Sequence, residues 1–423
     1  MKKLFKSIIV WVLWRQVDRL RAKYKPTVIA VAGSIGKTGT KRAIATVLTE
    51  GKKVQWQDGN YNDIVSVPLI FFGQKMPSLL NPVGWIKVLI SNERQIHSGY
   101  PYEVVVLEVG TDYEGNMDLF TPRLKVDYGV LTAIAAEHLV NFSDMEAVAT
   151  EELKITEIAN KVLVNIEEVD ARYMKRINSP LTYGTDAKDC HISAGKLSKD
   201  FKRPVVFTTK DPSIRASVKT RMIGQQNLPG MAAAVLLGSQ LRLSQKQIQK
   251  GLELIQPFAG RMQLLLGRKQ SLLIDDTYNA SPEAVKAALD TLYEISAPQK
   301  IAVLGQMNEL GKFSKELHIE VGTYCKAGEL DLVVTIGADA NAYLAEAAEK
   351  AGCKVVRCPS PYHAADIIKP LLTKGTVVLI KGSQNGVFAE ETTKLLLQRP
   401  SDAKRLVRQD KKWISVKAKQ FKA

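Results

Sequence analysis

The sequence has few of the residues that build metal centres or disulfide frameworks. It contains four cysteines and five histidines among 423 residues, and the cysteines form no Cys-x-x-Cys pair. Only Cys353 and Cys358 are close in sequence, and no group of histidines accompanies them. A zinc site is therefore not expected, and the cysteines are predicted to be reduced and structural, as in a reducing cytoplasm.

Long apolar runs, internal repeats and low-complexity tracts are absent as well. The apolar segment Ile8–Trp14 is far shorter than the ~20 residues that a membrane-spanning helix requires. No small-residue cleavage site follows it, so a signal peptide is not expected. The composition, 45% hydrophobic and 24% charged, is globular, and the length predicts two or three domains.

The chain is strongly basic, with a formal net charge of +16, and part of this excess lies at its two ends. Basic ends suit an anionic membrane surface, a nucleic acid or a phosphorylated substrate. The basic residues of 401–423 are explained equally well as a solvated tail. Aromatic and basic residues are not interleaved in the body of the chain, so nucleic acid is not an expected partner.

Residues 1–26 are predicted to form one amphipathic helix. Trp11 and Trp14 lie beside basic residues, which is typical of a helix in the plane of a membrane surface. A helix packed on the body of the protein explains the pattern equally well. The first alternative implies peripheral membrane contact through residues 1–25, at the inner face of the plasma membrane of a cytoplasmic protein.

The stretch Thr27–Thr40 is the one around which the chain is organised. Its β-branched beginning predicts a buried strand, Gly33–Gly36 predicts a turn, and Lys37 and Thr38 open a helix. A strand, a glycine loop and a helix in this order point backbone N–H groups and a helix N-terminus at phosphate. Lys37 is then placed for the outer phosphates and the Thr38 hydroxyl for Mg²⁺.

The alternation of strands and helices predicts an α/β protein with two mostly parallel sheets covered by helices. We expect a short β excursion over 189–220 and one continuous helix over 143–160. The expected divisions are a basic helix (1–26), a central nucleotide-binding domain (27–258), a Rossmann-like domain (259–400) and a basic tail (401–423).

Two residues that follow predicted strands are candidate metal ligands. Glu108 ends the apolar run Val104–Leu107, which places its carboxylate at the carboxyl edge of the sheet, where acids hold Mg²⁺. His138 follows the next strand and is a second candidate ligand or phosphate contact. A single histidine is more often structural, so its signal is weak.

Glu152 is a carboxylate on an otherwise apolar helical stripe that includes Val148, Ile155 and Ala159. Burying an unpaired charge is costly, so this residue needs a partner such as a cation or Mg²⁺. A slightly rotated helix would leave Glu152 solvated, because Leu153 is apolar too.

Two segments in the second half of the chain carry polar groups at predicted strand ends. Asp275–Pro282, with the sequence DDTYNASP, follows one strand and precedes a helix, and its acids suit ribose hydroxyls or an amino group. A helix cap with a proline in the first turn is the alternative explanation. Lys381 ends the last strand and would bring a cation to the same crevice.

In this order and spacing, the motifs resemble those of the Mur ligase family. GSIGKT resembles its GTxGKT loop, Asn60–Pro68 its NxNNxxGxP stretch, and LEVG the end of its glutamate-glycine strand. Gln226-Asn227 before an alanine-rich helix resembles its HNxxN segment. The Gly260-Arg261-Met262, DDTYNASP and KGS segments resemble its C-terminal signatures. The resemblance covers most of residues 27–398.

The resemblance implies an ATP- and Mg²⁺-dependent ligase that converts a carboxylate into an acyl phosphate, which an amine then attacks. It is greatest to the member that adds D-alanyl-D-alanine to a UDP-muramoyl tripeptide, an enzyme of peptidoglycan synthesis. The residues that it implies are catalytic Lys37, Glu108, His138, Glu152 and Arg261; nucleotide-binding Gly33, Ser34, Gly36, Lys37, Thr38, Asn227, Arg261, Asp276 and Asn279; metal-binding Thr38, Glu108, His138 and Glu152; and substrate-binding Asn60, Asn62 and Lys381.

The sequence departs from the family pattern at several positions. Gly39 replaces a usual threonine, Asp63 an asparagine, Ser66 a glycine and Gly230 an asparagine, which implies weakened or altered ATP and substrate contacts. Two other departures bear most directly on the reaction. Glu152 stands where the family has a lysine that is carbamylated to bind metal, and Lys154 stands where it has a glutamate. We therefore hypothesise that Glu152 supplies directly the negative charge that carbamylation provides. Only the basic, tryptophan-containing segment 1–26 stands where the family has its N-terminal domain that binds the UDP-sugar.

The expected partners are a small-molecule or lipid-linked cell-wall precursor and an amino-acid or dipeptide amine, with the chain acting as a monomer. Two alternatives stay open. One is ligation on another carboxylate, as in cyanophycin or folylpolyglutamate synthesis. The other is a catalytically weakened scaffold at the membrane, against which the intact Lys37, Thr38, Glu108 and His138 argue.

Overall fold

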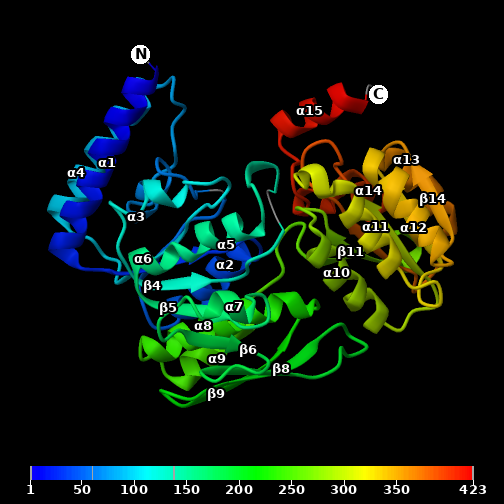
Figure 1. Cartoon of the computed structure of the whole chain (residues 1–423), viewed down its shortest axis with the longest axis horizontal. Helices are drawn as coiled ribbons and strands as arrows, with labels where there is room; N and C mark the ends of the chain where they lie inside the picture. Colours follow the sequence, from blue (N-terminus) through cyan, green and yellow to red (C-terminus); the bar gives the residue numbers. More distant parts are fainter. Residues whose placement is uncertain (1, 60, 137–138, 422–423) are drawn as a thin grey trace.

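The computed structural model describes residues 2–59, 61–136 and 139–421. It has two β-sheets, each with helices on both faces, and the chain passes from one to the other between α9 (Gln245–Leu254) and β10 (Gln263–Leu266) (Figure 1). The predicted α/β class is confirmed.

The first sheet has nine strands in the order β2-β3-β1-β4-β5-β6-β7-β8-β9. Neighbours from β2 to β7 are parallel, whereas the β7–β8 and β8–β9 pairs are antiparallel. The predicted β excursion over 189–220 is thus confirmed. The strands are β1 (Thr27–Ala32), β2 (Val54–Gln55), β3 (Val104–Glu108), β4 (Val126–Leu131), β5 (Ala159–Asn165), β6 (Leu181–Gly184), β7 (Cys190–Ala194), β8 (Arg203–Thr209) and β9 (Ile214–Thr220).

Alternate residues of β1 enter two different cores, as the twofold repeat of a strand requires. Val28 and Ala30 pack in a core with α1, whereas Ile29 and Val31 pack in a core with α2 and α8. The helices before the second sheet are α1 (Lys2–Tyr24), α2 (Lys37–Thr49), α3 (Val67–Phe71), α4 (Pro82–Ser98), α5 (Met145–Leu153), α6 (Ile155–Ile158), α7 (Ala171–Met174), α8 (Leu228–Gln240) and α9.

The prediction of one continuous helix over 143–160 is wrong. The helix is divided at Lys154 into α5 and α6, and strand β5 begins at Ala159, which pairs with Val126 of β4. The Lys154 ammonium lies 2.7 Å from Asp118 and 2.9 Å from Glu151. The strand pairing with Val126 and the ion pair with Asp118 depend on distant residues, and they override the local helix propensity.

The second sheet has six strands in the order β10-β11-β15-β12-β13-β14, and only the β10–β11 pair is antiparallel. Its strands after β10 are β11 (Leu272–Asp276), β12 (Lys300–Gly305), β13 (Leu332–Ile336), β14 (Val355–Cys358) and β15 (Val377–Lys381). Its helices are α10 (Pro282–Glu294), α11 (Ser314–Tyr324), α12 (Ala345–Lys350), α13 (Pro361–Leu371), α14 (Glu390–Leu396) and α15 (Lys411–Phe421).

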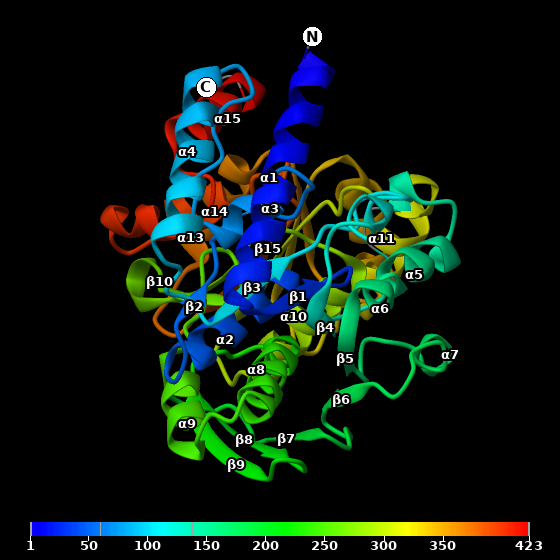
Figure 2. The same ribbon diagram turned by 90° about the vertical axis from the view of Figure 1, so that its left-hand side faces the viewer.

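Helices α1 and α4 pack together and project from the first sheet; we call residues 2–24 and 75–98 the arm (Figures 1 and 2). Leu13, Trp14, Val17 and Leu20 of α1 are buried, so this helix does pack on the body of the protein. Of the helices among the described residues, none is both long and apolar enough to cross a bilayer.

The last residues that the structure describes also pack on the protein. In α15, Lys417 is buried and its ammonium lies 2.5 Å from Glu391 and 3.4 Å from Glu390 of α14. The Trp413 ring meets that of Phe388 edge to face, with centroids 6.0 Å apart. The alternative of a wholly solvated tail is therefore wrong, because apolar contacts and buried ion pairs hold it.

Candidate functional site

The loop between β1 and α2 has a backbone conformation that requires glycine at two positions. Gly33 has φ 127°, and a Cβ there would lie 2.2 Å from the Thr132 hydroxyl oxygen at the end of β4. Gly36 has φ 86° and occupies the N-cap of α2. The loop therefore lies flat against the end of the neighbouring strand and exposes the N-terminus of α2.

Lys37 folds back over this loop. Its ammonium donates to the Gly33 carbonyl at 2.5 Å and to the Ser34 carbonyl at 3.2 Å. The positive charge of Lys37 is thus held next to the N-terminus of α2, where a helix dipole also favours an anion.

Thr38 and Glu108 come together, as the loop-and-strand prediction requires. The Thr38 hydroxyl donates to Glu108 Oε2 at 3.1 Å, and the Lys41 ammonium lies 3.1 Å from the same oxygen. The Lys41 side chain is 0% exposed and that of Glu108 is 6% exposed. Lys41, which the sequence analysis missed, therefore neutralises a buried acid at the edge of the site.

Glu152 is buried, so the solvated alternative does not hold. Its Oε1 accepts hydrogen bonds from Thr111 Oγ1 at 2.7 Å and Ser34 Oγ at 3.3 Å, while Oε2 has no partner among the described residues. Burial raises the pKa of Glu152 to about 7, although the Lys37 charge and the two hydroxyls act to lower it. The expected cationic partner is thus replaced by hydroxyls, with Lys37 acting at longer range.

Of the other three residues predicted near this edge, the structure describes only Asn62. The Asn62 carbonyl accepts a 2.8 Å hydrogen bond from Gly110 N, which joins it to the segment after β3. His138 and Asn60 lie outside the described residues. Within the described residues, no three His, Cys, Asp or Glu side chains form a cluster that would hold a metal ion.

In the second sheet, Asp276 and Lys381 form a buried ion pair between the ends of β11 and β15. Lys381 Nζ lies 2.6 Å from Asp276 Oδ2 and donates to the Asn279 carbonyl at 3.0 Å. The other oxygen of Asp276 accepts from Met262 N at 3.1 Å. The acid therefore ties the segment 260–262 to the sheet.

Arg261 lies in this tied segment and is oriented by an aromatic ring. Its guanidinium carbon is 4.3 Å from the centroid of the Tyr278 ring. Gly260 N donates to Asp275 Oδ2 at 3.1 Å, and Tyr278 N donates to the Gly260 carbonyl at 3.0 Å. These contacts hold Arg261 at the edge of the second sheet that faces the first.

A cavity of about 230 Å³ lies between the two sheets. Six of the predicted residues line it, from both halves of the chain: Gly36, Thr38, Asn227, Arg261, Asp276 and Lys381. Of the other predicted residues that the structure describes, none lines it, but hydrogen bonds join Lys37, Glu108 and Glu152 to its loop and walls.

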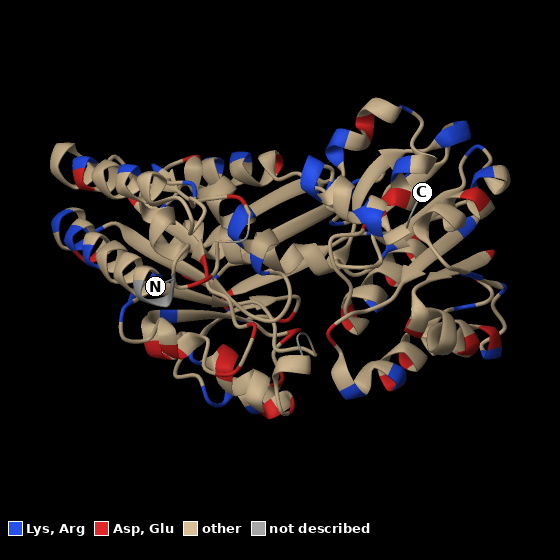
Figure 3. Ribbon diagram, turned by 90° about the horizontal axis from the view of Figure 1, so that it is seen from above, with Lys and Arg blue, Asp and Glu red and all other residues tan. Residues whose placement is uncertain are grey.

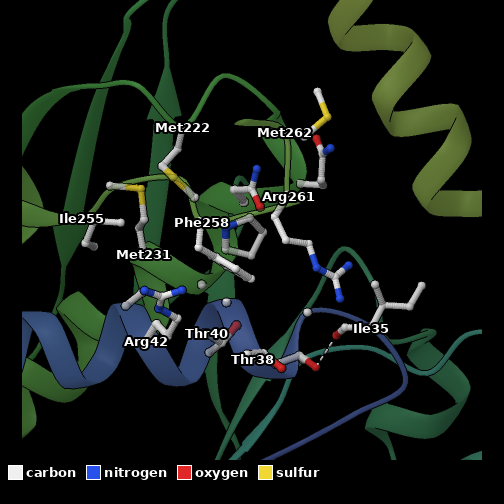
Figure 4. A pocket seen from close by; sticks show the side chains of 18 of the residues that line it. Ile35, Thr38, Thr40, Arg42, Met222, Met231, Ile255, Phe258, Arg261 and Met262 are labelled. Atoms are coloured by element: carbon white, nitrogen blue, oxygen red, sulfur yellow. Dashed lines mark hydrogen bonds between the residues drawn. The ribbon is translucent and has the colours of Figure 1, made fainter. Parts of the chain in front are cut away.

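One part of the cavity is apolar and contains two buried amide atoms without partners. Figure 4 shows Phe258 among the side chains of Met222, Met231 and Ile255, with Arg261 extending toward the segment that carries Ile35. Asn227 Nδ2 and Gln226 Oε1 are buried and have no hydrogen-bond partner among the described residues. An apolar slot with an unused donor and acceptor fits a flat heterocyclic base.

Two further wall residues, Arg42 and Phe258, were not found from the sequence, and a third, Gly230, stands where the family pattern has an asparagine. The Arg42 guanidinium carbon lies 4.7 Å from the Phe258 ring centroid, so α2 supplies a cation beside the aromatic ring. Gly230 lies where a Cβ would come 2.9 Å from Thr40 Oγ1, and it permits the close approach of α8 to α2. Phe258 lies three residues before Arg261. Its position next to the Gly260-Arg261-Met262 signature is the only sequence signal that could have identified it.

Family profiles cover both sheets. The Mur ligase middle domain matches residues 31–238, and the Mur ligase glutamate ligase domain matches residues 260–384. The chain belongs to the Mur ligase family, a family of ATP-dependent amide ligases, and the resemblance inferred from its motifs is confirmed.

Among its relatives is the UDP-N-acetylmuramoyl-tripeptide--D-alanyl-D-alanine ligase of Bacillus subtilis, 28% identical over 379 residues, or 88% of this chain and 76% of that one. The enzyme of the same name from Escherichia coli is 24% identical over 337 residues, or 76% of this chain and 67% of that one. The solved structure of MurF from Acinetobacter baumannii has a TM-score of 0.75 at 22% identity, covering 93% of this chain and 81% of that one. MurF from Thermotoga maritima in complex with ADP has a TM-score of 0.72 at 21% identity, covering 92% and 83%.

Proposed function

We propose that this chain uses ATP and Mg²⁺ to join an amine, D-alanyl-D-alanine or a similar one, to the carboxylate of a peptidoglycan precursor. The observation that carries the proposal is the cavity shared by Gly36 and Thr38 of one sheet and Arg261 and Lys381 of the other. A phosphate chain bound there would touch both halves of the protein.

Each part of the nucleotide is assigned to residues in or beside this cavity. Its triphosphate lies on the loop of Gly33, Ser34 and Gly36 and at the N-terminus of α2. Lys37 turns from the loop carbonyls to the outer phosphates. Asn227, with its unpaired amide nitrogen, contacts the base in the slot beside Phe258. Arg261, Asp276 and Asn279 complete the site from the second sheet, so that approach of the two halves is part of catalysis.

The residues around Glu108 fit a Mg²⁺ ion. Thr38 Oγ1 and a Glu108 oxygen are 3.1 Å apart, both are oxygen donors of the kind that Mg²⁺ prefers, and Glu152 Oε2 lacks a partner nearby. Thr38, Glu108 and Glu152 are the residues assigned to the metal, with His138 as a further candidate. The ion supplies neutralisation of the phosphate oxygens when it is bound.

The chain contributes positioning and charge to the reaction. A carboxylate oxygen of the precursor attacks the terminal phosphorus of ATP, and the bond to ADP breaks. The amine nitrogen then attacks the acyl carbon, inorganic phosphate leaves, and the amine loses a proton. Lys37 and Arg261 offset the negative charge that gathers on the transferred group. Asn60, Asn62 and Lys381 are assigned to the precursor.

The decisive experiment supplies ATP, Mg²⁺, UDP-muramoyl tripeptide and D-alanyl-D-alanine, and follows phosphate release and the mass of the pentapeptide product. We expect phosphate release that depends on the amine, and a loss of about 10²–10³-fold in kcat for Lys37→Ala. Lys350→Ala, on an exposed helix of the second half, is the matched control. ATP hydrolysis that ignores every amine and acid offered would reject the ligase assignment.

A further inference from the structure

The arm formed by α1 and α4 exposes apolar side chains that the rest of the protein leaves uncovered. Eight of the eighteen large apolar side chains that are exposed among the described residues lie in the arm, and six of these fall between residues 76 and 90. The most exposed are Leu80 at 72%, Val83 at 59% and Trp11 at 58%. Apolar exposure is thus concentrated in the arm, which marks an interaction surface.

Helix α4 is apolar on two faces. Trp85, Val88 and Ile96 are buried on the face that packs inward. Val83, Ile86 and Ile90 follow at intervals of three and four residues, so they form a second stripe on the outer face, where each is about half exposed or more. A helix that only completes a core needs one apolar face, and the second stripe remains to be covered.

The outer stripe continues across the contact between the two helices. A shallow groove between them is lined at one end by Val12 of α1 and by Leu89 and Ile90 of α4, and its other lining residues are polar: Gln16, Glu93, Arg94, His97 and Ser98. Ile8 and Trp11 stand exposed on the same helix as Val12. The apolar residues of the two helices therefore meet at Val12, Leu89 and Ile90.

The segments that form the arm carry many more basic than acidic residues. Residues 1–25 contain eight Lys or Arg and one acid, and residues 75–98 contain three Lys or Arg and one acid. Figure 3 shows Lys and Arg recurring along these helices. The Arg15 guanidinium carbon lies 4.8 Å from the Trp11 ring centroid, and Lys87 and Arg94 flank the stripe of α4. Of the two acids, Glu93 is 2.7 Å from Arg19 and is thereby neutralised.

We propose that the arm binds to the surface of an anionic lipid bilayer, with the outer stripe and Trp11 inserted at the boundary of headgroups and acyl chains. Apolar side chains with tryptophan and a basic border have the composition that such a boundary binds. A nucleic acid would meet the cations but leave the apolar stripe uncovered. The arm is separate from the cavity, so this binding requires neither ATP nor the ligase reaction.

The test is sedimentation of the full chain with vesicles, in the absence of substrates. One set of vesicles contains phosphatidylcholine alone, and the other contains equal amounts of phosphatidylcholine and phosphatidylglycerol. We expect binding to the second set, a shift of Trp11 fluorescence to shorter wavelength that Trp11→Phe reduces, and weaker binding at 1 M salt, where the Debye length falls to about 3 Å.

Two double variants test the apolar stripe and the basic residues beside it separately. Ile86→Ser/Ile90→Ser should lower the partition coefficient by about tenfold or more, because each buried methylene contributes to insertion. Lys87→Ser/Arg94→Ser should remove much of the preference for phosphatidylglycerol. The matched control is Leu371→Ser/Leu395→Ser, which changes two exposed apolar residues of the other half of the chain and should bind as the unaltered chain does.

Several outcomes would overturn the proposal. These are no binding to either vesicle, full binding by the Ile86→Ser/Ile90→Ser variant, or an equal loss in the control variant. Self-association through the arm without vesicle binding would instead assign the surface to a protein partner. Melting temperature and amine-dependent phosphate release, measured on each variant, separate this result from a failure to fold or a failure of the ligase assignment.

Discussion

The Lys41 ammonium lies 3.1 Å from Glu108 Oε2, and both side chains are buried beneath the loop of the proposed phosphate site. Two buried charges stabilise each other only as a pair, since removal of one leaves the other desolvated and unpaired. Lys41 therefore balances the negative charge of Glu108, which ends β3 and is assigned to the proposed metal site.

Replacing Lys41 should be costly for stability. Lys41→Met should lower the free energy of unfolding by about 3–5 kcal/mol, because it leaves the Glu108 carboxylate without its buried cation. The double variant Lys41→Met/Glu108→Gln should lose less than the two single changes summed. The measurement is urea denaturation, with Lys350→Met as control, whose pair with Glu346 is exposed and screened by solvent. A Lys41→Met loss no larger than this control would contradict the pairing.

Two adjacent glutamates of α5 should respond in opposite ways to the same change. Glu152→Gln should lower kcat by about 100-fold with no loss of melting temperature, since burial already raises the pKa of Glu152 to about 7 and the amide is isosteric. Glu151→Gln should keep kcat but lower the melting temperature, because Glu151 accepts a hydrogen bond from Met117 N at 2.5 Å and pairs with Lys154.

The hypothesis that Glu152 replaces a carbamylated lysine has its own test. Carbamylation requires carbon dioxide, which bicarbonate supplies, so if Glu152 itself provides the negative charge, removal of bicarbonate should leave turnover unchanged. Full turnover in Glu152→Gln would disprove its role.

Arg408 connects the C-terminal segment to the proposed nucleotide site. Its guanidinium donates to Glu390 and to the backbone carbonyls of Thr277 and Tyr278, the residue whose ring lies beside Arg261. Arg408→Met should therefore raise KM for ATP several-fold and lower the free energy of unfolding by about 3 kcal/mol, because Glu390 loses a buried partner.

The control for Arg408 is Arg405→Met, which alters an exposed cation of the same segment. Both variants are compared by ATP titration of phosphate release and by thermal melting. A lower melting temperature with an unchanged KM would show that Arg408 holds the fold and does not position the site.

Asp275 should make stability depend on pH. Burial is the main cause that raises its pKa from 3.8 to about 7, and Glu390 and Asp276 add to it, although the Thr277 and Thr393 hydroxyls oppose this shift. Between about pH 4 and pH 7 the folded protein therefore holds a proton that the unfolded chain has released. The stability from this group is greatest at low pH and is lost as the pH rises through about 7.

Asp275→Asn removes this titration while keeping the shape of the protonated acid. The unfolding free energy of the unaltered chain, relative to that of the variant, should therefore fall between pH 5 and pH 8. Denaturation at several pH values measures it. A difference that is constant across that interval would rule out the protonated acid.

The parts of the fold that were predicted correctly, and the predicted residues that the structure brings together, are those encoded locally. The glycine loop, the strand that ends at Glu108 and the segment around Asp276 each carry a short pattern whose geometry follows from backbone sterics and strand order. Such patterns do not depend on what packs against them. The residues lie close together because neighbouring parallel strands end at the same edge of the sheet.

The remaining features depend on partners far away in the chain. Lys41 looks like a solvated helix residue until Glu108 is placed beside it, and Lys417 looks like part of a free tail until α14 supplies two acids. Helix α4 was not predicted, since its two apolar faces obscure the usual repeat. The division of the 143–160 helix likewise follows from the pairing of Ala159 with Val126, which local propensity does not report.

Only Lys25 and Pro26 separate α1 from β1, and β1 runs directly into the glycine loop. The arm and the proposed phosphate-binding loop are consequently joined by a short, stiff link, and Lys25 has φ 48° at the junction. A chain held by its arm would search for lipid-linked precursors by lateral diffusion in two dimensions. The cavity of the proposed ligase reaction would then stay at a fixed height and tilt above the bilayer, and substrates anchored in the same leaflet would reach it at a high local concentration.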